Sequence, residues 1–253
     1  MFQLQVAFAI VTLLFTTGPV QASSPTDRAE EQRSEAAIAI LAQADKAVRP
    51  VRTVEYEIRG VPGGASDGFL APTRGTVILA ERPGEMPKFL FDLHTDRRDT
   101  AIGHHQTLGF DGETYFLIDH RTKKAYRDFD PAVMGLGGRA RFVTMIPEFV
   151  VDAPFDDEFN AEQIRLVGSR EIEGVDCHEI FVEYQGAPAQ ATWFFSKSDH
   201  LPRGKTLHFL IPEGDEGSVA MTLSAVRINP EVPESAFRLT VPDGYEIVDD
   251  FAP

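Results

Sequence analysis

The stretch RGTVILAERPGEMPKFLFDL, residues 74–93, decides the class of fold that we expect for this 253-residue chain. In its first half Val77 and Leu79 stand two residues apart, and in its second half Phe89 and Phe91 repeat that spacing. Because successive side chains of a β-strand point to opposite faces of a sheet, a period of two places these apolar side chains on one face. The stretch therefore predicts two β-strands that each bury one face.

The same period recurs along most of the chain. It returns in nine further segments: 54–58, 115–118, 164–167, 177–184, 192–195, 206–211, 219–228, 237–240 and 245–248. Turn-forming pairs, such as Asp111-Gly112 and Asp243-Gly244, separate several of them. Since helices do not alternate with strands as they do in βαβ units, we predict a mainly β fold built on a single antiparallel sheet of about eleven strands.

Two segments depart from this period and are expected to be helical. Ser24 and Pro25 begin the first, because a serine cap and a proline at the first helical position favour a helix start. Its apolar residues recur at three- and four-residue spacing and stop before Pro50. The second segment, residues 131–151, is interrupted by glycines and predicts two short helices. The acidic run that follows, residues 152–162, is expected to be a solvated loop.

Two helical segments are too small to bury one whole face of so large a sheet. We therefore expect the sheet to curl into an open, incomplete barrel with a cavity for an apolar ligand; a fully packed core is the alternative that composition supports equally. The candidate ligand-binding residues are the large apolar strand residues Val77, Leu79, Phe89, Phe91, Tyr115, Leu117, Trp193, Phe195 and Phe209. Methionines and glycines in the second helical segment suit a movable lid. The candidate lid residues are Met134, Leu136, Phe142, Met145, Ile146 and Phe149.

The start of the chain predicts export from the cytoplasm. Residues 1–22 carry no charge, contain an apolar run from Val6 to Phe15 and end in Val20-Gln21-Ala22, which is typical of a cleaved secretory signal peptide. The run is too short to cross a bilayer as a helix, although the missing positive residues leave an uncleaved tether as an alternative. We expect residues 23–253 to form one domain in the periplasm.

Charge and cysteine usage limit the partners and the chemistry. A formal net charge of −15 argues against a nucleic-acid partner, because the two would repel each other at long range. The single cysteine, Cys177, cannot form an internal disulfide and is expected to be an inert buried thiol. The core must therefore stabilise the fold without a covalent cross-link.

The order of motifs resembles a known superfamily. The segments that carry the resemblance are 74–83, 89–93, 110–119, 123–126, 171–181, 193–202 and 237–249. Together they resemble the bacterial outer-membrane lipoprotein carriers (LolA/LolB-like), and most closely an uncharacterised branch of predicted periplasmic proteins. The resemblance implies an open barrel of about eleven strands, closed on one side by helices over a cavity for acyl chains. It also implies that Arg82 holds the lid closed through hydrogen bonds to backbone carbonyls; a solvated arginine at a strand end is the alternative.

Enzymatic chemistry finds little support in the sequence. No Gly-x-Ser-x-Gly elbow or cysteine-protease signature is present, so we expect no catalytic residues. A small hydrolase would need a converging cluster of histidine and aspartate, for example around His104 and His105. Asp92 with His94, or His104 with a residue on the next strand, share a face, but their spacing matches no metal motif. We therefore expect no metal and no cofactor.

These observations predict a periplasmic binding or carrier protein rather than an enzyme. Its expected cargo is an acyl chain or a lipidated protein, and a protein of the inner or outer membrane is a further candidate partner. The alternative is an envelope sensor that reads the state of lipid or lipoprotein and signals to a membrane partner.

Overall fold

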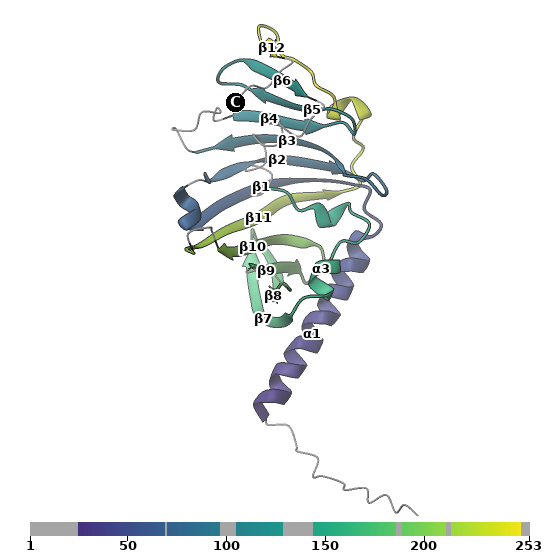
Figure 1. The fold of residues 1–253 in the computed structure, drawn as a ribbon. Coiled ribbons are helices and arrows are strands. Elements are labelled where there is room, and N and C mark those ends of the chain that lie inside the picture. The colour runs from purple at the N-terminus through teal and green to yellow at the C-terminus, as the bar shows by residue number, and fades with distance from the viewer. Residues whose placement is uncertain are drawn as a thin grey trace, which may run out of the picture.

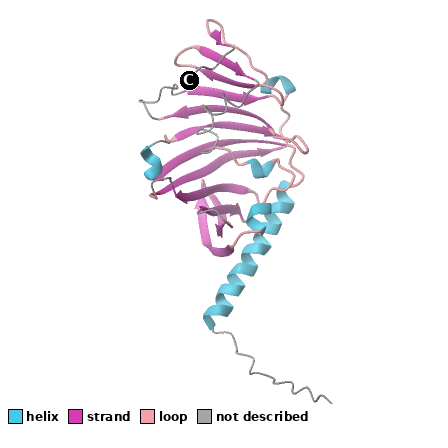
Figure 2. Ribbon diagram, viewed as in Figure 1, coloured by secondary structure: helices cyan, strands magenta, loops and turns pink. Residues whose placement is uncertain are grey.

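Strands dominate the computed structural model, which describes residues 25–68, 70–96, 105–128, 144–185, 189–210 and 214–248 (Figure 2). In the described residues, twelve strands form one sheet. They are β1 (Thr53–Gly64), β2 (Thr73–Ala80), β3 (Lys88–Thr95), β4 (His105–Phe110), β5 (Tyr115–Asp119), β6 (Lys124–Asp128), β7 (Gln163–Ile172), β8 (Val175–Glu183), β9 (Ala189–Ser196), β10 (Pro202–Leu210), β11 (Glu216–Ile228) and β12 (Glu246–Val248).

The strand order is β12-β6-β5-β4-β3-β2-β1-β11-β10-β9-β8-β7. From β1 to β6 and from β7 to β11, strands adjacent in the chain pair antiparallel, and the long pairing of β1 with β11 joins these two halves of the sheet (Figure 1). The two ends of this order, β12 and β7, do not pair with each other, so the sheet is open. The expected open half-barrel is confirmed.

Among the described residues, the helices are few and, apart from the first, short. They are α1 (Pro25–Val48), α3 (Asp156–Phe159) and the 3₁₀ turns η1 (Ala65–Gly68), η2 (Pro147–Phe149) and η3 (Glu234–Phe237). Helix α1 begins at Pro25, as predicted, and its C-terminal half buries Ala37, Leu41 and Ala44 while its N-terminal half runs away from the sheet (Figure 1). The apolar face is confined to this half because only there does the helix pack against other elements.

The sheet has two faces of different character. We call inner face the side that α1, η2 and α3 cover, and outer face the opposite side. Inner-face side chains such as Tyr56, Phe89 and Trp193 are fully buried and belong to one large apolar cluster. A smaller cluster around Phe116 and Ile118 forms on the outer face, where the segment before β12 packs on it. β5 therefore buries apolar side chains on both faces of the sheet.

Three expectations about the strands are wrong in detail. β4 and β6 were not expected, because β4 has a polar residue at an inner position, Gln106, and β6 is only five residues long. The strand expected over 237–240 is absent, since Phe237 ends the 3₁₀ turn η3 and its side chain is buried there. The sheet is also not wholly antiparallel, because β12 pairs with β6 in parallel.

Candidate functional site

Aromatic side chains form a continuous surface on the inner face of the first half of the sheet. The rings of Phe89 and Phe91 stack with centroids 4.7 Å apart, and those of Phe110 and Tyr115 stack at 4.3 Å. Phe89 connects the two pairs at 5.9 Å from Phe110. Offset stacking adds to the stabilisation that burial provides.

A second aromatic group lies on β9. The rings of Trp193 and Phe195 stack at 5.5 Å, and Phe155 meets both of them edge-on. The nine residues predicted to bind ligand all belong to the large inner cluster or pack against it; seven are buried, whereas Tyr115 and Phe209 are partly exposed. The structure thus brings together every member of the predicted set, although their role in binding stays a prediction.

The segment from Thr144 to Asn160, which we call the inner cover, lies over the second aromatic group and over β1. Phe155 contacts Trp193 and Phe195, and Phe149 contacts Tyr56. The inner cover contains η2 and α3. Three predicted lid residues, Met145, Ile146 and Phe149, are buried in it against the inner face. The other three, Met134, Leu136 and Phe142, lie outside the described residues. Val150 and Phe155, which were not predicted as lid residues, are buried as deeply as the first three.

Tyr56 on β1 holds one end of the inner cover. Its hydroxyl donates to the carbonyl of Thr144 and accepts from the N–H of Ile146, both at 3.1 Å. The side chain is fully buried, and this burial raises the pKa of Tyr56 well above its ordinary value. The phenol therefore stays neutral and acts as a donor and an acceptor at once.

Glu158 holds the other end of the inner cover. Its Oε1 accepts from Trp193 Nε1–H at 3.1 Å and from the Tyr184 hydroxyl at 2.6 Å. Only 4% of Glu158 is exposed, and burial raises the pKa of its carboxyl. The expectation that the acidic run is a solvated loop is therefore wrong at this position. Phe155 is the residue in this run that could have indicated burial, because it is apolar and stands among carboxylates. Its side chain is buried against the inner face.

An ion pair joins the middle of the inner cover to β10. Lys205 Nζ lies 2.9 Å from Glu148 Oε1. Both side chains are largely buried, with 10% of the Lys205 side chain and 14% of the Glu148 side chain exposed. Lys205 also lies 4.5 Å from the centroid of the Trp193 ring, in a cation–π contact. Glu148 Oε2 is buried with no hydrogen-bond partner among the described residues. The inner cover thus meets the sheet through apolar side chains and through the polar contacts of Tyr56, Glu158 and Lys205.

Arg82 lies beside the inner cover rather than across it. Its guanidinium donates to the carbonyl of Met86 at 3.3 Å, pairs with Glu85 and lies over the Phe110 ring. The carbonyl that it binds belongs to its own loop, so the lid-closing role implied by the resemblance stays a prediction. The loop does reach the inner cover, because the Gly84 N–H donates to Asp152 Oδ2 at 2.8 Å.

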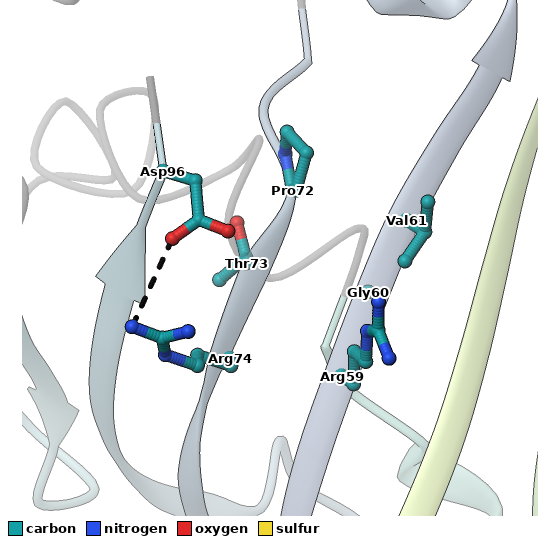
Figure 3. Close-up of a pocket in the computed structure, with 7 residues that line it drawn as sticks. All are labelled: Arg59, Gly60, Val61, Pro72, Thr73, Arg74 and Asp96. Atoms are coloured by element: carbon teal, nitrogen blue, oxygen red, sulfur yellow. Dashed lines mark ion pairs between the residues drawn. The ribbon is translucent and has the colours of Figure 1, made fainter. Parts of the chain in front are cut away.

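A pocket of about 510 Å³ lies elsewhere, at the ends of β1, β2 and β3 (Figure 3). Arg59, Arg74 and Asp96 line it together with Thr73 and Val61, and Arg74 pairs with Asp96 at 3.9 Å. None of the nine residues predicted to bind ligand is among the residues that line it. This pocket is therefore not the apolar cavity that the sequence predicts.

A family model described as a predicted periplasmic protein (DUF2092) matches residues 88–249. The chain belongs to this family. The match runs from β3 to β12 and includes the inner cover, Trp193 and Lys205. It confirms both the periplasmic location and the branch of predicted periplasmic proteins that the motifs resemble. No curated protein matches the chain.

Several solved structures are similar to this DUF2092 protein at low sequence identity. LprF from Mycobacterium bovis is 11% identical with a TM-score of 0.49, over 85% of this chain and 99% of its own. The Mycobacterium tuberculosis lipoprotein LppX is 13% identical with a TM-score of 0.47, over 78% and 98%. A LolA superfamily protein from Nitrosomonas europaea is 10% identical with a TM-score of 0.34, over 80% and 97%. Within the described part of the DUF2092 chain, every helix is too short or too polar to cross a membrane.

Proposed function

We propose that this protein is a periplasmic carrier, without catalytic activity, that encloses an acyl chain of a lipid or a lipidated protein between its inner face and its inner cover. One observation carries the proposal: an aromatic and aliphatic sheet face is covered by a separate segment that apolar contacts and the polar contacts of Tyr56, Glu158 and Lys205 hold in place.

The energetics of transport support such an arrangement. Moving an acyl chain of about fifteen methylenes from an apolar site into water costs roughly 12 kcal/mol of free energy, at ~0.8 kcal/mol per CH₂. A carrier must therefore enclose most of the chain and must still release it. The inner cover suits this exchange, because its buried side chains Ile146, Phe149 and Phe155 occupy inner-face contacts that methylenes could take over.

The test is uptake of a fluorescent fatty acid by purified protein. Phe91→Asp places a charge in the middle of the inner face and is expected to abolish uptake. Val167→Asp is the matched control, because Val167 on β7 is 48% exposed and the same change there leaves the inner face intact. Uptake by folded Phe91→Asp protein at the wild-type level would exclude the proposed site.

A second variant covers the case in which Phe91→Asp does not fold. Lys205→Met removes the ion pair to Glu148 while keeping an apolar contact with Trp193. It is expected to speed uptake, since the inner cover then opens more easily. Unchanged kinetics would show that the inner cover does not gate the inner face. Native mass spectrometry of protein from its own envelope would identify the cargo, and a co-purifying membrane protein without lipid would favour the sensor instead.

A further inference from the structure

Four polar side chains that the proposed function does not use gather on the outer face. Asp92 and His94 lie on β3, His105 begins β4, and His120 follows β5 directly. His94 stands opposite His105 in the strand register, and the His120 N–H donates to the His105 carbonyl. Residues from three strands therefore meet in one row across the sheet.

The side chains in this row are in close contact. His105 Nε2 lies 2.5 Å from Asp92 Oδ1. The ring of His105 stacks between those of His94 and His120, with centroids 4.1 Å and 4.0 Å away. One ligand atom from each of Asp92, His105 and His120 can be chosen so that all three lie within 4.8 Å of one another. Ligands of a tetrahedral zinc ion stand about 3.4 Å apart. The three side chains must therefore move closer together, and the stacked rings of His105 and His120 must turn out of parallel, because an imidazole nitrogen binds a metal in the plane of its ring.

Two hydroxyl groups orient the third of these rings. His120 Nε2 lies 2.9 Å from Thr107 Oγ1, and its Nδ1 lies 3.0 Å from the Tyr245 hydroxyl. Tyr245 comes from the C-terminal segment and packs on the outer-face cluster with Phe116. A metal-binding histidine usually has its second ring nitrogen held by such a partner, which fixes the ring and its tautomer. Tyr245 is placed to hold Nδ1 of His120, which leaves Nε2 as the ligand atom in exchange for its contact with Thr107.

We propose that Asp92, His105 and His120 bind a divalent transition-metal ion, with zinc as the best match. Two imidazoles and one carboxylate suit zinc, whereas magnesium and calcium prefer oxygen ligands throughout. Three protein ligands leave a fourth position for water or for a donor from another molecule. The site lies on the opposite face of the sheet from the inner cover, so it does not depend on the proposed function.

The test is titration of the full chain with Zn²⁺ against a chelating indicator, using protein without a polyhistidine tag. The wild type is expected to bind one equivalent and to unfold at a higher temperature as Zn²⁺ is added, because a ligand of the folded state stabilises it. His105→Asn and His120→Asn are expected to abolish this binding. Tyr245→Phe should weaken it by roughly tenfold, since loss of an orienting partner costs 10- to 100-fold in affinity.

His208→Asn is the matched control, because His208 is an exposed strand histidine on β10, away from the row. It should bind Zn²⁺ as the wild type does. The proposal fails if the wild type binds no Zn²⁺ at micromolar concentrations. It also fails if the folded double variant of His105 and His120, checked by circular dichroism, binds as tightly as the wild type.

Discussion

The two faces of strand β3 are built from alternate residues of one segment, yet they differ in chemistry. On the inner face Phe89 and Phe91 are fully buried in stacked aromatic contacts. One residue along, Asp92 is 53% exposed at its side chain and pairs with His105 on the outer face. Inner-face stability comes from apolar burial, which is proportional to the area removed from water, whereas an exposed ion pair contributes little. Substitutions on the two faces should therefore differ sharply in cost.

The largest effect is expected from removing an inner-face ring. Phe89→Ala should lower the free energy of unfolding by roughly 3–5 kcal/mol, because it removes buried area and leaves a cavity. Urea denaturation followed by tryptophan fluorescence measures this, with Trp193 as the single reporter. A loss below 1 kcal/mol would mean that the inner face is not a packed core.

A smaller effect is expected where the inner cover meets the sheet. Tyr56→Phe removes the hydroxyl that binds Thr144 and Ile146 and leaves a buried N–H without its partner. The cost should be about 1–3 kcal/mol. Hydrogen exchange should accelerate within the inner cover more than within β1. Uniform acceleration across the sheet would show instead that the inner cover opens only with global unfolding.

The buried carboxyl at the other end of the inner cover predicts a pH effect. Burial raises the pKa of Glu158 above its ordinary 4.5, so the folded state favours the protonated form. The contribution of Glu158 to the free energy of unfolding is therefore greatest below pH 4.5, and it is lost as the pH rises through the raised pKa. Glu158→Gln should flatten this decline between mildly acidic and neutral pH. Parallel stability curves for the two proteins would contradict the assignment.

The smallest effect is expected on the outer face. Asp92→Asn, measured in the presence of a chelator, should change the free energy of unfolding by less than about 1 kcal/mol, because the pair that it breaks is largely solvated. Comparison with Phe89→Ala sets the two faces of one strand against each other. A loss as large as that of Phe89→Ala would show that the outer-face row is part of the core.

Much of the sheet could be predicted because its cause is local. The period of two in residues such as Val77 and Phe89 places side chains on a face whatever the neighbouring strand is, and the cap at Ser24 and Pro25 specifies a helix start by itself. β4 and η3 could not be predicted in the same way. Gln106 is buried at an inner position only because neighbouring strands surround it, and Phe237 is buried without the help of a strand.

The candidate sites show the same division more strongly. The nine inner-face residues follow from alternation alone, so their grouping was predictable. The contacts of Glu158 and Lys205 could not be predicted. Each of these residues lies 26 to 57 positions from its partners in the sequence and meets them only where the inner cover packs on the sheet. His105 and His120 likewise have no motif spacing, since strand register rather than sequence distance brings them together.

The amino-acid sequence by itself determined a mainly β periplasmic protein with one strongly apolar sheet face, because strand period, turn residues and composition act over a few positions. Tertiary structure alone decided what covers that face and which polar groups meet on its reverse. Both depend on pairing between distant strands, and that pairing is selected by the packing of the whole sheet, which no short segment encodes.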